Sequence, residues 1–574
     1  MDIKIPLPFK TCLFDEEMKE PTYYLSGIPK SFLIKTASLF LSYKANNSKY
    51  EGLFGFLDGF FCSANKPFVN RILSNILTYE TKMNTRKIDI NDYVIHQRLA
   101  DLEFLKIVFN SSKENNGVSP FNIKEVEVKI FKAYVAINQS LNQSSNKIQV
   151  PEKIDKPADL AKFFFLLNLN SFDLNNFNLL EIIITQYYKG CLFMKFLDEK
   201  IETKELLKNF INHYGVDSVK KYISFLSVIH LKLIQDDKIT HVVIEDVELF
   251  EFYKKHSLFR LSKINQVDYN DVRSLPLITQ HEKGRKVITV IDSLLTAEMF
   301  YNGLYFRLKK INDSLVEDRI DLLRLKTHDF SEKLLFKNTI ESIFGKKYIQ
   351  FSGDRIDDLM DGGIDYYVRN GNKVFVFESK DIFLSSKAKV SFDEETVLKE
   401  IKTKLYHDCS KSKDKGILQI RNFIEKMINK QINFDQNYRV DSINIYPILV
   451  LHNRIFNAPG FNLILQDLFK KSCDDRFGNL KGKINPLIVI DIDTLIFNHE
   501  FFESGKLNFE EVLKSYSRDI LIPAFKIPKR INRKKSEELL ISFSEYLKRK
   551  TFGMKRHRLP EFIAETAKEV LPEN

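Results

Sequence analysis

Apolar residues recur at intervals of three and four positions along most of the chain up to about residue 270. Such spacing places the apolar side chains on one face of a helix. A polar stretch rich in Asn, Ser and Gln, residues 138–147, predicts a loop between helical units. We therefore expect a mainly helical N-terminal domain over residues 1–280. The clearest helical patterns span residues 95–109, 179–197, 206–214 and 219–234.

The pattern changes after residue 280, where short apolar runs begin to alternate with helical segments. A strand is predicted at 285–291 and a helix at 295–310, so residues 281–329 are expected to connect two domains. The next segments give a helix-strand-strand-strand-helix-strand order, which is typical of a mixed α/β domain. We place this domain at 330–505 and a C-terminal extension at 506–574. Its helices are predicted at 330–344 and 417–428, and its strands at 348–352, 364–368, 374–380, 443–451 and 487–496.

The hairpin at 364–380 is the most informative of these elements. Asn370 and Gly371 stand between two runs of alternating apolar residues, and Asn-Gly is a strong signal for a two-residue turn. With these two residues as the loop, Asp365 pairs with Val376 on the opposite strand.

Three charged residues share one face of this hairpin. Because side chains alternate between the faces of a strand, Asp365, Glu378 and Lys380 point the same way. The two carboxylates become diagonal neighbours, with Cβ atoms roughly 7 Å apart, which suits one divalent cation. Lys380 would orient a water and offset charge on a phosphorane-like transition state.

The alternative is a half-exposed hairpin whose Glu and Lys are solvated. The sequence Val-Phe-Val-Phe before Glu378 is apolar on both faces, however, as expected of a buried central strand. Charges in such a place cost free energy unless they compensate one another or hold a metal. We therefore favour a functional site.

The segments Gly363-Ile364-Asp365 and Glu378-Ser379-Lys380, separated by a hairpin, resemble the PD-(D/E)xK phosphodiesterase superfamily. This superfamily includes restriction endonucleases and many repair and phage-defence nucleases. The resemblance covers about residues 330 to 500, with Ile in place of the eponymous Pro, a position that varies in the superfamily. It implies a restriction-endonuclease-like mixed sheet core flanked by helices, and hydrolysis of nucleic-acid phosphodiesters with Mg²⁺, for which Mn²⁺ can substitute.

The resemblance also implies roles for individual residues. Asp365 and Glu378 are expected to bind the metal, the main-chain carbonyl of Ser379 to be a further ligand, and Lys380 to orient the attacking water.

Two further candidates come from the neighbouring helices. Members of this superfamily often add a Glu from the preceding helix, and at 100° per residue Glu332 falls on the apolar stripe of helix 330–344. Stabilisation of a helix N-terminus is the alternative role for Glu332. In similar proteins a polar residue near the start of the next helix often reaches the active site, which here indicates Gln419. A solvent-facing side chain is the alternative for Gln419.

Positive charge is concentrated near the C-terminus. The formal net charge of the chain is +11, and residues 526–558 hold twelve Lys or Arg against three Glu. Such clusters can bind phosphates and would form a nucleic-acid clamp beside a nuclease. The alternative is an amphipathic helix that packs Phe543 and Leu547 on the body of the protein. The predicted nucleic-acid-binding residues are Lys529, Arg530, Arg533, Lys534, Lys535, Lys548, Arg549 and Lys550.

Several function classes find no support in the sequence. The five cysteines form no C-x-x-C pair, so neither a zinc framework nor a disulfide ladder is indicated, and a reducing cytoplasm fits best. There is no Walker loop and no dinucleotide-binding fingerprint. No apolar run approaches the roughly 18 to 20 residues needed to cross a bilayer, and no signal peptide is indicated.

The sequence thus predicts a metal-dependent endonuclease that acts in restriction or phage defence. DNA is the expected partner and substrate, by analogy with the superfamily alone. One alternative is a non-catalytic nucleic-acid-binding or assembly module. Another is an effector nuclease that a partner activates, with the N-terminal domain as sensor. A homo-oligomer or a partner protein is compatible with either alternative.

Overall fold

The protein forms two compact units. The first comprises Met1–Asn146, Phe177–Arg319 and Lys568–Asn574, and the second comprises Lys147–Asn176 and Ile320–Ala567. The second unit contains the hairpin that carries the candidate residues. The computed structural model describes residues 5–43, 52–83, 89–111, 122–145, 157–236, 239–258, 267–315, 317–391, 393–474, 476–477, 483–524, 538–554, 565 and 568.

The first unit is mainly helical, with a small antiparallel sheet. The sheet has the order β3-β5-β4 and consists of β3 (His241–Val243), β4 (Leu277–Glu282) and β5 (Arg285–Val290). Two short strands, β1 (Ile5–Pro6) and β2 (Tyr93–Val94), pair separately. The longer helices are α3 (Lys30–Tyr43), α4 (Leu53–Phe60), α5 (Lys66–Met83), α6 (Arg98–Asn110), α7 (Ile123–Ser145), α10 (Leu179–Glu199), α11 (Lys204–Tyr214), α12 (Val219–Gln235), α13 (Val247–Lys255) and α17 (Asn302–Asn312). The shorter ones include α1 (Phe9–Cys12), α2 (Pro21–Leu25), α15 (Tyr269–Ser274) and α16 (Ser293–Ala297).

The loop predicted at 138–147 is wrong as far as Ser145, because α7 continues to that residue. Asn138 is fully buried there, and its side-chain amide donates to the main-chain carbonyls of Leu7 and Ile95 at 3.2 and 3.0 Å. Tertiary hydrogen bonds therefore override the polar composition of this stretch.

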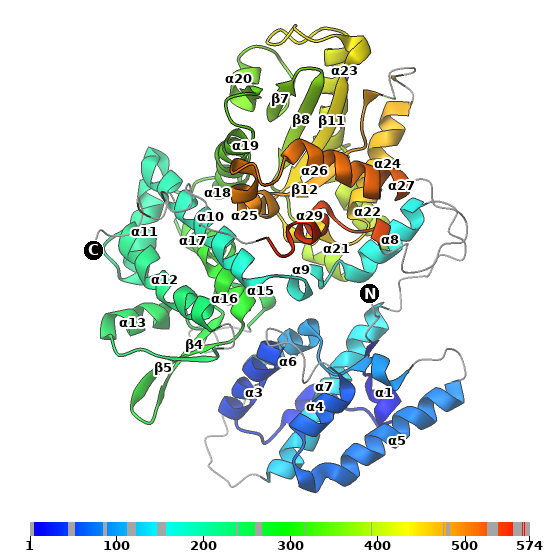
Figure 1. Cartoon of the computed structure of the whole chain (residues 1–574). Coiled ribbons are helices and arrows are strands. Elements are labelled where there is room, and N and C mark those ends of the chain that lie inside the picture. Colours follow the sequence, from blue (N-terminus) through cyan, green and yellow to red (C-terminus); the bar gives the residue numbers. More distant parts are fainter. Residues whose placement is uncertain are drawn as a thin grey trace. The chain divides into compact units, whose positions relative to one another are not determined.

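The second unit is built on a five-stranded mixed sheet with the order β12-β11-β8-β7-β6 (Figure 1). β7 is antiparallel to β6 and β8, whereas β11 is parallel to β8 and β12. The central strand β8 is buried from Val374 to Ser379. Helices together with this mixed sheet confirm the α/β class predicted from the sequence. The strands are β6 (Ile349–Ser352), β7 (Tyr366–Asn370), β8 (Lys373–Lys380), β11 (Asn444–Leu451) and β12 (Ile488–Asp491).

Helices cover both faces of this sheet. On one face, the π-helix η6 (Leu325–Phe336) and α19 (Lys337–Phe344) pack on β8, with the Phe344 and Phe375 ring centroids 5.4 Å apart. On the other face, Phe423 of α23 (Gly416–Ile428) lies 6.2 Å from the Tyr367 ring.

The remaining helices of the second unit surround this core. The strand predicted at 487–496 ends at Asp491, where a helix begins, so its second half is wrong. In the part of the chain that the structure describes, no helix has the length and apolar character needed to cross a membrane. The helices that surround the core of the second unit are α8 (Pro157–Asn168), α9 (Phe172–Asn175), α18 (Leu322–Arg324), α20 (Gly353–Asp357), α21 (Ser386–Ser391), α22 (Glu394–Leu405), α24 (Phe461–Asp474), α25 (Ile492–Glu503), α26 (Phe509–Tyr516), α27 (Ile522–Ala524) and α29 (Phe543–Thr551).

The turn of the hairpin differs from the predicted turn. Asn370 pairs with Lys373, so the two loop residues are Gly371 and Asn372. Gly371 has a φ of +61°, and Asn372 is not among the residues of positive φ. Glycine with positive φ at the first loop position is the pattern of a type II′ turn, whereas the prediction assumed that Asn370 opened the loop.

The changed turn shifts the strand register by two residues. Tyr367, and not Asp365, pairs with Val376. A shift of two keeps every side chain on its face of the sheet. Continuing the observed register brings Asp365, which directly precedes β7, opposite Glu378. The two carboxylates are thus closer neighbours than the predicted diagonal pair.

A buried ion pair fastens the hairpin to the segment after α23. Arg369 on β7 donates to the Asp435 carboxylate through Nε at 2.5 Å and Nη2 at 2.9 Å, and the Tyr367 hydroxyl donates to it at 2.7 Å. Burial by itself would raise the pKa of Asp435, but these hydrogen bonds hold it below its usual value. The pair therefore fixes β7, the strand that directly follows Asp365.

Asp435→Ala leaves a buried guanidinium without its partner, so we expect the free energy of unfolding to fall by about 3 to 5 kcal/mol. Urea unfolding followed by circular dichroism measures this loss. Because the pKa of Asp435 is lowered in the folded chain, its stabilising effect is present above about pH 4 and is lost as the pH falls further. Asp441→Ala, at an exposed position, is the control, and equal stability of the two variants would contradict this account.

Candidate active site

Three elements of the second unit bring charged side chains together around Lys380, the last residue of β8. Its Nζ lies 2.7 Å from Glu378 Oε1, 3.6 Å from Asp365 Oδ2 and 3.8 Å from Glu332 Oε1. Nζ also donates to the main-chain carbonyl of Ser379 at 3.0 Å. All four groups predicted as metal ligands therefore surround one positive charge, the ammonium of Lys380.

Glu378 is the most deeply buried member of this cluster, with no exposed surface. Neither of its carboxylate oxygens has a hydrogen-bond partner among the residues that the structure describes. The contact of Oε1 with Lys380 is an ion pair whose geometry is not that of a hydrogen bond. Burial, followed by the neighbouring Asp365 carboxylate, raises the pKa of Glu378 to about 8.

Asp365 and Lys380 are the next members of the cluster, in which one ammonium faces three carboxylates. Asp365 Oδ2 accepts a hydrogen bond from the main-chain nitrogen of Ser379 at 2.7 Å. Burial nevertheless raises the pKa of Asp365, against the opposing effect of Lys380. Burial would lower the pKa of Lys380, but the surrounding carboxylates raise it above its usual value. The lysine thus stays charged, while the carboxylates compete for it.

The donor set fits a divalent cation such as Mg²⁺. Hard cations prefer carboxylate and carbonyl oxygens, and the three carboxylates with one ammonium carry a formal charge of −2. The buried Oε2 of Glu378 is an acceptor that the described residues leave unsatisfied. Within the described residues no three His, Cys, Asp or Glu side chains are arranged as metal ligands. The three carboxylates instead converge on the Lys380 ammonium. A cation would therefore require Lys380 to turn aside.

Gly363 explains the local sequence before Asp365. A Cβ on Gly363 would lie 2.6 Å from Ile356 Cγ2 on helix α20, which is too close for any other residue. The start of α20 contacts the same segment, because the main-chain nitrogen of Gly353 donates to the main-chain carbonyl of Asp365 at 2.8 Å. The short segment Gly-Ile-Asp is thus fixed by packing against α20.

Glu332 comes from the π-helix η6, where hydrogen bonds run from i to i+5. The angular count of 100° per residue that selected it was therefore wrong, although the carboxylate does face Lys380. The helix already begins at Leu322 with α18, so Glu332 is not in a first turn. His328 Nδ1 lies 3.3 Å from Glu332 Oε2, and this contact raises the pKa of His328.

A second polar cluster ties the same π-helix to the end of β8. Lys326 and Ser331 both bind the buried Asp381 carboxylate, the serine hydroxyl donating at 2.8 Å and the lysine as an ion pair. Ser379 Oγ lies 2.8 Å from His452 Nε2. Sequence analysis missed this cluster, although Asp381 directly after the Glu-Ser-Lys segment was a signal that could have found it.

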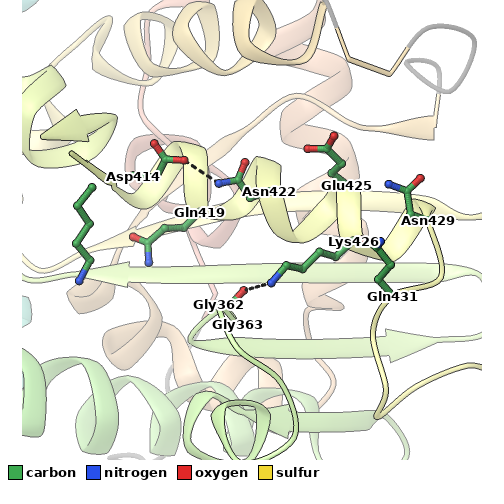
Figure 2. Close-up of a pocket in the computed structure, with 10 residues that line it drawn as sticks. Gly362, Gly363, Asp414, Gln419, Asn422, Glu425, Lys426, Asn429 and Gln431 are labelled. Atoms are coloured by element: carbon green, nitrogen blue, oxygen red, sulfur yellow. Dashed lines mark hydrogen bonds between the residues drawn. The ribbon is translucent and has the colours of Figure 1, made fainter. Parts of the chain in front are cut away.

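Gln419 lines a polar groove along α23 (Figure 2). The helix begins at Gly416, where an added Cβ would lie 3.8 Å from Lys380 Cγ. The groove thus begins next to the carboxylate cluster, and no hydrogen bond to the described residues holds the Gln419 amide. A direct role for Gln419 in the reaction stays a prediction.

The basic tail is only partly described. Lys529, Arg530, Arg533, Lys534 and Lys535 lie outside the described residues. Helix α29 carries the second basic group, which is exposed and consists of Lys548, Arg549 and Lys550.

The opposite face of α29 is buried, with Phe543 and Leu547 at 0 % exposure. The packing that the amphipathic alternative predicted is therefore present. Arg549 Nε also donates to Glu545 at 3.2 Å on the same helix. Whether this tail binds nucleic acid stays a prediction.

Comparison of the chain with known proteins identifies no relative. No family model matches the chain, and neither the curated proteins nor the solved structures give a significant match. Function has to be inferred from the geometry of the site.

Glu378→Gln keeps the shape of the side chain and removes a poorly compensated charge. We expect this change to raise the free energy of unfolding of the metal-free protein by about 1 kcal/mol at pH 8. Lys380→Met leaves the carboxylates without their ammonium and should lower it by about 3 kcal/mol. Urea unfolding of both variants provides the measurement, and a loss of stability in both would sink this interpretation of the cluster.

A pH dependence follows from the raised pKa of Glu378. The carboxyl takes up a proton on folding between its usual pKa of 4.5 and about 8. Its contribution to stability is therefore complete below about pH 4.5 and is lost as the pH rises through 8. Between pH 6 and pH 9 the Tm of the metal-free protein should fall further than that of Glu378→Gln, and Mg²⁺ should raise only the former. Parallel Tm profiles with equal responses to Mg²⁺ would count against the assignment.

Proposed function

We propose that the second unit is a Mg²⁺-dependent endonuclease with a restriction-endonuclease-like core, and that it hydrolyses DNA phosphodiester bonds. The observation that carries this proposal is the cluster of Asp365, Glu378 and Glu332 around the Lys380 ammonium at the end of a buried strand. A structural ion pair needs one carboxylate for one ammonium. The excess of carboxylates costs stability, and a cation-binding role explains that cost.

The chemistry can be assigned residue by residue. A divalent cation at these carboxylates would act as a Lewis acid and lower the pKa of a bound water. Asp365, oriented by the main-chain nitrogen of Ser379, and Glu378 would hold it. Lys380 would hydrogen-bond the attacking water and offset the negative charge that develops on the phosphoryl oxygens. Glu332 would be the outer carboxylate.

The topology supports the core assignment. The three antiparallel strands β6, β7 and β8 follow the long helix that contains Glu332, and α23 and the parallel strand β11 come after them. Apart from α21 and α22, which lie between β8 and α23, this is the element order predicted from the sequence pattern. DNA as substrate, a role in restriction or phage defence and a cytoplasmic location depend on the sequence alone and stay predictions.

Supercoiled plasmid tests the proposal directly. The full-length protein with Mg²⁺ should convert it to nicked or linear DNA, and EDTA should stop the reaction. Asp365→Asn and Lys380→Ala should each slow cutting by a factor of about 100 or more, because each removes charge stabilisation in a buried site. The exposed positions Asp441 and Lys346 offer matched controls, since Asp441→Asn and Lys346→Ala should cut at the wild-type rate.

The alternatives predict different outcomes. Undiminished cutting by both active-site variants would contradict the assignment of the site. Binding of DNA without cutting by the wild-type protein would favour a non-catalytic binding module. Activity that appears only with a partner or during phage infection would favour an effector nuclease.

A further inference from the structure

A polar groove of about 510 Å³ runs along α23 in the second unit (Figure 2). One wall is a helix stripe in which Gln419, Asn422, Lys426 and Asn429 follow one another at three- and four-residue spacing. These positions share one face of a helix and extend over about 15 Å. The groove is therefore elongated along the helix.

The amide groups of this groove are available to a ligand. The side chains of Gln419, Asn429 and Gln431 line it and make no hydrogen bond to any residue that the structure describes. Each carboxamide has two donor hydrogens and an acceptor oxygen. Gln419 lies toward one end of the groove and Asn429 and Gln431 toward the other (Figure 2). Such groups suit a ligand that presents paired donors and acceptors at both ends.

The acidic groups of the groove are already engaged by the protein. The Asp414 carboxylate lies 2.8 Å from His407 Nδ1, and it accepts a hydrogen bond from Asn422 at 2.8 Å (Figure 2). Glu425 pairs with Arg476 at 2.9 Å. Arg421 Nη2 also lies 3.9 Å from Asp414 Oδ2, so each of the two carboxylates has an arginine beside it that reduces its repulsion of an anionic ligand.

The lysines, in contrast, are not neutralised by carboxylates. Lys413 has no ion-pair partner among the described residues. Lys426 donates only to main-chain carbonyls, those of Asp361 and Gly362, at 2.5 and 3.2 Å. The pKa of Lys415 is lowered, first by burial and then by repulsion from lysines that include Lys413 and Lys380. Lys413, Lys415 and Lys380 therefore lie close enough to repel one another where the groove adjoins the cluster.

The groove also adjoins the cluster along the chain. Gly363, two residues before Asp365, lies on the wall opposite α23. At the other wall, α23 begins at Gly416 against Lys380. A ligand in the groove would therefore end beside the carboxylates.

We propose that this groove binds an unpaired strand of nucleic acid next to the scissile phosphate and reads its bases. This deepens the proposed nuclease function and rests on it. Lys413 and Lys426 contact phosphates, and the free carboxamides bond base edges, as Asn and Gln do in nucleic-acid complexes. A helix that reads a duplex must protrude into the major groove, whereas α23 lines a concave surface, so a single strand fits better. Its described lining contains no aromatic side chain, so hydrogen bonds rather than stacking select the bases.

Fluorescence anisotropy with labelled single-stranded DNA tests this proposal, with Ca²⁺ in place of Mg²⁺ to prevent cutting. The double variant Asn429→Ala with Gln431→Ala should weaken binding by about tenfold, since it removes two hydrogen bonds. It should also reduce the differences in affinity among oligonucleotides of different base composition. Lys413→Gln should weaken all of them alike and lower the dependence of affinity on salt. Asn370→Ala and Lys346→Gln, exposed and outside the groove, should bind as the wild type does.

The outcomes separate this proposal from the nuclease assignment. Unchanged affinity in the double variant, or tighter binding of duplex than of single strand, overturns the groove proposal. If the wild type does not cut DNA but the double variant still loses affinity, the nuclease proposal fails and only the binding of a strand by the groove is supported. Cutting that Asp365→Asn abolishes, together with unchanged strand affinity in the double variant, gives the reverse result.

Discussion

The interaction between the Lys380 ammonium and the carboxylates around it constrains the whole second unit. Glu378 lies in the core of the sheet, where an uncompensated carboxylate would cost several kcal/mol. Lys380 meets part of that cost, two residues along the same strand face. Asp365 and Glu332 add two further carboxylates, so the negative charge of the cluster exceeds its positive charge. A cluster with this charge is stable only in a scaffold that holds its parts by other contacts.

The scaffold supplies those contacts on both sides of β8. The Arg369–Asp435 pair fixes the strand that follows Asp365. The buried Lys326–Asp381 pair fixes the π-helix to the residue after Lys380. Neither pair belongs to the carboxylate cluster, yet each holds an element that contributes a carboxylate to it. The elements that carry the carboxylates are thus held in place by ion pairs a few residues away from the cluster.

Sequence alone predicted the face of the hairpin but not its register. The predicted face is right because the observed register differs from the predicted one by two residues, and side chains alternate between the faces of a strand with a period of two. The choice between Asn370-Gly371 and Gly371-Asn372 depends on backbone angles that composition does not encode. The π-helix of Glu332 and the groove along α23 were also out of reach, because both depend on tertiary packing. Burial of Asn138 reversed a loop prediction for the same reason, and the short apolar run after Asp491 could be strand or helix by pattern alone.

The claim on which everything else depends is that the carboxylates hold a divalent cation. Anomalous X-ray diffraction from crystals of the full-length protein grown with Mn²⁺ tests it most directly. The account predicts an anomalous peak about 2 Å from carboxylate oxygens of both Asp365 and Glu378, with the Lys380 ammonium moved away from its present contact. A map without a peak there at saturating Mn²⁺, with Lys380 still against Glu378, would contradict the account.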